Sequence, residues 1–200
     1  ALSPLTSIYG IVDASAFFAA FTLHIGLDSE YVQSQLFGNY NIKNMLAAAS
    51  IGHFFEVPMC DIKVALESYA PSNNRSQLQR TDKNTLILDM YNANPTSMRA
   101  ALEQFVTVSK SNTAVILGEM YELGDISIAE HSAILDFIKK SAIEKIFLVG
   151  NWPQIQQDNI HYFGNSQDVF EYMQIHALQG YTILIKGSRG VKLETVLPAL

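Results

Sequence analysis

Cysteine is the scarcest informative residue in this sequence. Cys60 has no second thiol in the chain to pair with, so an internal disulfide framework is excluded. A single cysteine fits a reducing compartment, and we expect a cytoplasmic protein.

Long apolar runs and clustered positive charge are missing as well. No stretch reaches the roughly 18 apolar residues that a membrane-spanning helix needs, so we expect no membrane span. The net charge of -6 gives no electrostatic footprint for nucleic acid. No methionine precedes Ala1, and the first residues lack the basic-then-apolar layout of a signal peptide. We therefore expect a processed product or a piece of a longer protein.

Two glycine-rich nucleotide motifs are also absent. The chain has no G-x-x-x-x-G-K-[ST] phosphate loop and no G-x-G-x-x-G dinucleotide fingerprint. The five histidines show no metal-ligand spacing, so we expect no metal site built from this chain.

The hydrophobic content of 48% supports a real core, and the chain changes character near residue 72. Residues 8–35 have a short, β-like pattern that predicts two or three antiparallel strands. Residues 41–55 follow as a helix, and residues 61–69 as a shorter one with Asp61 as its expected cap. Polar turn-forming residues at 71–77 then indicate a domain boundary.

Strands and helices alternate cleanly after this boundary. We expect strands at residues 85–90, 113–118, 145–150 and 181–186, and helices at 96–110, from Ser127, from Ser166 and at 191–197. Continuous apolar strands between helices predict a mostly parallel sheet covered on both faces, and so a Rossmann-like α/β domain. Ser127 and Glu130 are expected to form a capping box, with Ile128 facing inward, and Ser166 to cap its own helix.

Unusual polar groups follow three of these strands, in residues 89–94, 118–124 and 186–190. In a parallel sheet these ends share one edge, where open α/β folds place ligands. Arg189 suits bidentate capture of a carboxylate or phosphate. Glu119 and Glu122 suit a metal or an amine as well as they suit helix capping. His131, as a lone histidine, is more often structural than catalytic.

Five short motifs occur in an order that resembles the Mur ligases over residues 35–200. They are residues 38–48 (GNYNIKNMLAA), 71–76 (PSNNRS), 89–98 (DMYNANPTSM), 118–124 (GEMYELG) followed by His131, and 186–194, which begins KGSRG. The resemblance is to the carboxyl-terminal portion of such a ligase.

This resemblance implies that residues 1–71 are the C-terminal part of the central ATP-binding domain and residues 72–200 the C-terminal Rossmann-like ligase domain. It implies an ATP-dependent acid–amino-acid ligase in peptidoglycan synthesis, with D-alanyl-D-alanine and UDP-MurNAc-tripeptide as substrates. ATP and Mg²⁺ would be required. The phosphate loop and most magnesium ligands would lie in missing domains, so the chain alone would be inactive.

The resemblance also implies roles for individual residues. Nucleotide contacts fall on Asn44, Arg75, Asp89, Tyr91, Asn92 and Asn94. The residues near the incoming dipeptide would be Lys186, Ser188 and Arg189, and Arg189 or Lys186 would pair with its free carboxylate.

Two alternatives stay open. One is a non-catalytic nucleotide- or partner-binding module derived from such a ligase, although charged groups kept at three strand ends argue against it. The other is a related ligase with a different amine substrate, such as folylpolyglutamate synthase. The Tyr-Asn-Ala-Asn-Pro run at residues 91–95 favours the dipeptide-adding branch.

Overall fold

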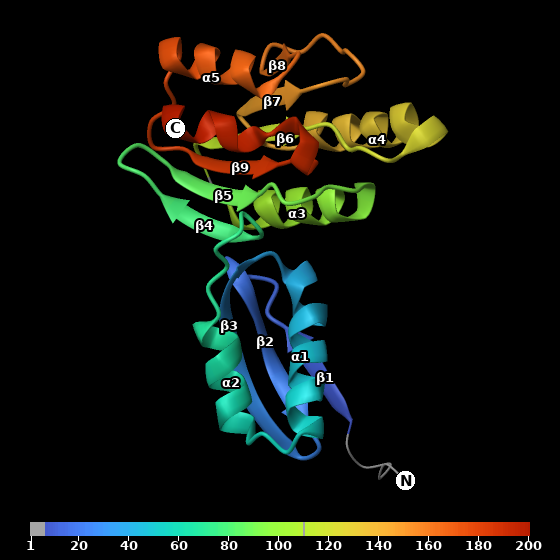
Figure 1. The fold of residues 1–200 in the computed structure, drawn as a ribbon, viewed down its shortest axis with the longest axis vertical. Helices are drawn as coiled ribbons and strands as arrows, with labels where there is room; N and C mark the ends of the chain where they lie inside the picture. Colours follow the sequence, from blue (N-terminus) through green and yellow to red (C-terminus); the bar gives the residue numbers. More distant parts are fainter. Residues whose placement is uncertain (1–6, 110) are drawn as a thin grey trace. The chain divides into compact units, whose positions relative to one another are not determined.

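The computed structural model describes residues 7–109 and 111–200, and the chain divides into two compact units, up to Pro71 and from Ser72 onward. Figure 1 shows the elements of each unit. Among the described residues, no helix is both long enough and apolar enough to span a membrane.

The first unit is a three-stranded antiparallel sheet with two helices. In chain order its elements are β1 (Ile8–Val12), β2 (Phe18–Ile25), β3 (Asp28–Phe37), α1 (Ile42–Phe54) and α2 (Met59–Ser68). Apolar side chains of β2, β3, α1 and α2 form its core, among them Phe21, Leu23, Val32 and Met45. The antiparallel strands predicted for residues 8–35 are therefore confirmed.

The second unit contains a six-stranded sheet in the order β4-β5-β9-β6-β7-β8. Its elements are β4 (Gln77–Arg80), β5 (Thr85–Asp89), α3 (Pro95–Val108), β6 (Thr113–Gly118), α4 (Ser127–Lys139), β7 (Lys145–Val149), β8 (Ile160–Phe163), α5 (Ser166–Ile175) and β9 (Thr182–Lys186). β4 pairs antiparallel with β5, and every other pairing is parallel. The predicted α/β fold with a mostly parallel sheet is confirmed.

Successive side chains of a strand point to opposite faces of a sheet, and both faces of this sheet are buried. Leu86, Leu88 and Ile185 join a core with α5 and the C-terminal segment. Ile87 and Leu184 alternate with them, and both are fully buried. We assign cover of that second face to α3 and α4, which pack on each other.

Several local predictions were wrong. α2 begins at Met59 after Pro58, so Asp61 lies inside the first turn and does not cap it. α4 has no side-chain cap, because its capping position is Ile126 and Ser127 is already the first helical residue. Ile128 is 74% exposed and does not face inward.

Two further corrections concern helix ends and the C-terminus. The cap of α5 is Asn165, which accepts hydrogen bonds from two following backbone amides, so Ser166 is the first helical residue. Residues 189–191 and 193–199 form short 3₁₀ helices where one closing α-helix was expected. Lys192 between them has a left-handed backbone, which interrupts a continuous helix.

Candidate functional site

The carboxyl ends of three neighbouring parallel strands form the floor of the site. β9 lies between β5 and β6, with Lys186 in register with Asp89 on one side and Leu117 on the other. The polar segments that follow these strands therefore meet at one edge of the sheet, as the sequence predicted.

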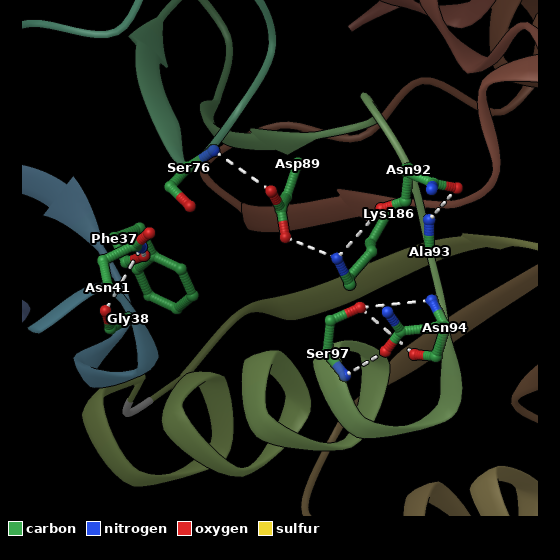
Figure 2. A network of polar contacts seen from close by, with 10 residues as sticks. All are labelled: Phe37, Gly38, Asn41, Ser76, Asp89, Asn92, Ala93, Asn94, Ser97 and Lys186. Carbon is green, nitrogen blue, oxygen red and sulfur yellow. Dashed lines mark hydrogen bonds and ion pairs between the residues drawn. The ribbon is translucent and has the colours of Figure 1, made fainter. Parts of the chain in front are cut away.

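A buried ion pair joins two of the predicted site residues. Lys186 Nζ lies 2.6 Å from Asp89 Oδ2, with side-chain exposures of 2% and 7%. The other carboxylate oxygen, Asp89 Oδ1, accepts a hydrogen bond from the Ser76 amide at 3.1 Å, and Lys186 Nζ also lies 3.5 Å from the Asn92 carbonyl oxygen. Figure 2 shows this network. Asp89 and Lys186 are thus enclosed, and they fix the chain segments around them.

Arg75 is held between two anchored residues. Asn74 and Ser76 both have left-handed backbones, with φ of 57° and 51°. The Met90 amide donates to the Asn74 carbonyl at 2.8 Å, and the Ser76 amide donates to Asp89. Because both neighbours are hydrogen-bonded to the end of β5 or the residue after it, the backbone position of Arg75 is fixed while its side chain is exposed.

Two guanidinium groups converge on the exposed ring of Tyr91. The Arg75 Cζ lies 5.4 Å from the ring centroid and the Arg189 Cζ lies 5.7 Å from it, within the range of cation–π attraction. A cavity of about 280 Å³ is lined by Tyr91, Asn92, Tyr121, Glu122, Ser188, Arg189 and Gly190. A second, of about 430 Å³, shares Tyr91 and Arg189. Paired guanidiniums beside a cavity suit phosphate or carboxylate.

The two asparagines of this segment are engaged locally. Asn94 caps α3, since its Oδ1 accepts the Ser97 amide at 2.8 Å while Ser97 Oγ accepts the Asn94 amide at 3.2 Å. Asn92 Oδ1 accepts the amide of Ala93 at 2.8 Å, and its exposed side chain lines the smaller cavity.

The segment after β6 contributes Tyr121, a wall of the cavity that the sequence had not singled out. Ser188, which is buried, accepts a hydrogen bond from the Tyr121 amide at 2.9 Å. Burial, with a smaller effect of the Glu119 carboxylate, raises the pKa of the Tyr121 hydroxyl. A tyrosine hydroxyl is protonated at neutral pH even at its ordinary pKa of 10.0, so this one can donate a hydrogen bond.

Two glycines bring β6 and β9 unusually close at the site floor. A Cβ on Gly187 would lie 2.8 Å from the Gly118 Cα, and one on Gly118 would lie 3.2 Å from the Gly187 Cα. Real Cβ atoms do not approach backbone as closely as 2.8 Å, so position 187 requires glycine, whereas a Cβ on Gly118 would need its neighbours to shift by a few tenths of an ångström. The sequence signal for this contact is a glycine at the end of each apolar run, as the last residue of β6 and as the first residue after β9.

Asn44 belongs to the first unit, where it is exposed on α1. The Asn41 side-chain amide donates to the Phe37 and Gly38 carbonyls at 2.9 and 3.3 Å and so secures the turn before α1 (Figure 2). Within the ranges that the structure describes, no three acidic, histidine or cysteine side chains cluster to hold a metal ion.

Comparisons with known proteins agree on the family. Residues 74–189 match the family described as "Mur ligase, glutamate ligase domain". A UDP-N-acetylmuramoyl-tripeptide–D-alanyl-D-alanine ligase from Buchnera aphidicola subsp. Baizongia pistaciae is 33% identical over 186 residues, which cover 90% of this chain and 40% of that protein. The ligase of the same name from Bacillus subtilis is 28% identical over 176 residues, covering 82% of this chain and 38% of the relative.

Solved structures agree with these relatives. A crystal structure of MurF from Acinetobacter baumannii superposes with a TM-score of 0.84 at 26% identity, covering 96% of this chain and 44% of that one. The chain spans about two fifths of the length of the curated relatives that it matches.

Proposed function

The chain belongs to the Mur ligase family, and from this premise we propose that it is part of an ATP-dependent ligase that joins D-alanyl-D-alanine to UDP-MurNAc-tripeptide in peptidoglycan synthesis. Curated relatives with that activity in their names support the choice of substrates. The observation that carries the proposal is the convergence of Arg75 and Arg189 on Tyr91 beside two cavities. Turnover is assigned to the whole ligase, in the cytoplasm, and not to this chain alone.

The reaction needs positioning and charge neutralisation more than protein nucleophiles. ATP supplies a phosphoryl group to the carboxylate of the tripeptide, which gives an acyl phosphate and ADP. The dipeptide amine attacks the acyl carbon, phosphate leaves, and the amine loses a proton as the amide forms. The negative charge on the phosphoryl oxygens and on the dipeptide carboxylate calls for cations, which Arg189 provides at the cavity wall and Arg75 beside the Tyr91 ring.

The proposed nucleotide contacts are divided by their exposure. Arg75, Tyr91 and Asn92 have exposed side chains, and we assign them direct contacts with the nucleotide. Asp89 is enclosed and Asn94 caps α3, so their proposed contribution is to shape the segment between them. Asn44 keeps its proposed adenine contact from the first unit.

The dipeptide residues divide in the same way. Arg189 is exposed on the cavity wall and is the proposed partner of the dipeptide carboxylate. Lys186 is paired with Asp89, and buried Ser188 holds the Tyr121 amide, so both support this wall. The described residues lack a cluster suited to a metal, so we place the Mg²⁺ ligands mostly in the rest of the ligase.

Phosphate release by the complete reading frame tests the proposal. The assay contains Mg-ATP and UDP-MurNAc-tripeptide, with D-alanyl-D-alanine, with glutamate, or with no amine. Release that depends on the dipeptide and yields the extended peptide is expected. Release that depends on glutamate would indicate a related ligase with a different amine substrate, and nucleotide binding without release would indicate a binding module. Either result would overturn the proposed substrates.

A further inference from the structure

Three consecutive backbone amides after β6 are each tied to a different part of the second unit. The Glu119 amide donates to the Val149 carbonyl at 2.9 Å, at the end of β7. The Met120 amide donates to His131 Nε2 at 2.9 Å, and the Tyr121 amide donates to Ser188 Oγ at 2.9 Å. Of these three hydrogen bonds, only that of the Met120 amide is accepted by an ionisable side chain, His131 of α4.

The surroundings of His131 determine which ring nitrogen carries the proton. The ring is buried, and Nδ1 lies 2.7 Å from the Ser127 carbonyl oxygen. A carbonyl oxygen can only accept, so Nδ1 must bear the hydrogen, and an amide N–H can only donate, so Nε2 must be bare. Both hydrogen bonds are therefore satisfied only by the neutral Nδ1–H tautomer.

The ring is also fixed in orientation by an aromatic neighbour. Trp152 packs edge-on against it, with ring centroids 4.6 Å apart and an interplanar angle of 88°. The Trp152 indole N–H donates to the Val149 carbonyl at 3.2 Å, the same oxygen that accepts the Glu119 amide. The Val149 carbonyl therefore fixes both Trp152, which packs on His131, and the Glu119 amide.

This loop forms one wall of the smaller cavity. Tyr121 and Glu122 line it, and the Tyr121 ring lies so close to Gly190 that a Cβ there would clash with its Cε2 atom. Glu122 has a left-handed backbone with φ of 64°, a conformation that persists only where its surroundings enforce it. The Met120 amide, held by His131, and the Tyr121 amide, held by Ser188, together set the position of Tyr121.

We propose that His131 is a positioning residue for this wall, a neutral Nδ1–H imidazole whose Nε2 holds the Met120 amide and thereby places Tyr121 against the cavity. The role in catalysis rests on the proposed function, whereas the hydrogen bond and tautomer do not.

Nuclear magnetic resonance of this chain tests the positioning role directly. The ring ¹⁵N shifts should show a protonated Nδ1 and a bare Nε2, and the opposite tautomer would overturn the proposal. His131→Leu removes the acceptor at similar volume, and His131→Gln restores one, because its Oε1 can take the place of Nε2. Hydrogen exchange of the Met120 amide should speed up about tenfold in the Leu variant and recover in the Gln variant.

Ser132→Ala is the matched control, because this hydroxyl lies on the same helix and donates to the Ile128 carbonyl at 2.7 Å. It should leave Met120 exchange unchanged. Equal exchange in the Leu variant and the unaltered chain would refute the positioning role. The ring shifts of the unaltered chain decide the question even if both variants misfold.

Kinetics of the complete ligase provide the second readout. His131→Leu should raise the KM for D-alanyl-D-alanine about tenfold with the KM for ATP nearly unchanged, and His131→Gln should restore it. A uniform loss of kcat without rescue would indicate a merely structural role. If the unaltered ligase does not use the dipeptide, the proposed function fails while the exchange experiment still judges His131.

Discussion

Asp89 and Lys186 face each other as register partners at the ends of β5 and β9, and their side chains form a buried ion pair of 2.6 Å. Removing one partner leaves the other charged and buried, which costs far more than the pair contributes in net stability. This pair therefore contributes both to the stability of the second unit and to the shape of the candidate site.

Lys186→Met should lower the free energy of unfolding of the second unit by about 3–5 kcal/mol, because Asp89 would be left without its cation. The double variant Lys186→Met/Asp89→Leu should recover much of that loss, since no buried charge remains. Urea unfolding followed by Trp152 fluorescence measures this, because the chain's one tryptophan is buried in the second unit. Equal losses in the single and double variants would refute the argument.

Leu88→Ala should destabilise the same unit by about 2–5 kcal/mol, because Leu88 is fully packed between the sheet and its covering elements. Ile128→Ala is the control, since that side chain is 74% exposed and should change stability by less than about 0.5 kcal/mol. The same Trp152 unfolding curve measures both. Similar losses at the two positions would contradict the assigned core.

Arg189→Ala in the complete ligase should raise the KM for D-alanyl-D-alanine by about tenfold or more, because a hydrogen bond to a charged group is worth about 1.5–3 kcal/mol. Arg189→Lys should recover only part of this, since lysine cannot bind a carboxylate through two parallel donors. Steady-state kinetics with varied dipeptide provide the measurement. An unchanged KM would show that Arg189 does not bind the carboxylate.

Arg75→Ala should chiefly raise the ATP requirement of the complete ligase, by about tenfold, because it removes one of the two cations beside Tyr91. Its side chain is exposed, so stability should be nearly unchanged. Arg80→Ala, another exposed arginine a few residues away on β4, is the matched control. If both variants raised the KM for ATP equally, general surface charge and not Arg75 would be responsible.

The stability of the second unit should fall as the pH is lowered through 6.5, the ordinary pKa of histidine, in part because of His161. Burial, with smaller effects of Lys145 and His176, lowers the pKa of His161 below its ordinary value of 6.5. The unfolded chain therefore binds this proton at a higher pH than the folded one, so stability rises with pH between the two pKa values. His161→Gln should flatten that part of a Trp152 unfolding-versus-pH curve. An unchanged slope would show that His161 does not contribute.

The apolar strands β5, β6, β7 and β9 could be predicted from sequence because each is a continuous hydrophobic run between helical patterns. β4 and β8 were missed, since each has only four residues and β4 reads Gln-Leu-Gln-Arg, which has no apolar run. They form because a neighbouring strand offers unpaired backbone groups, and that is a property of the assembled sheet.

The candidate site could be predicted in outline because parallel strands place their carboxyl ends together. Which of its residues are exposed and which are buried could not be predicted, because burial depends on contacts between segments far apart in sequence. Asp89 and Lys186 are 97 positions apart, and the sequence does not reveal that they pair. Tyr121 was overlooked for the same reason, since its amide is held by Ser188 from another strand end.

The close approach of Gly118 and Gly187 has a consequence for how such a site can diversify. Its floor is main chain against main chain, and no side chain can be inserted there without parting two strands. Chemical variation is therefore confined to the rim, where Tyr91, Tyr121 and Arg189 stand in solvent. Substitutions at these positions can alter the chemistry of the cavity lining while the strands beneath keep their spacing.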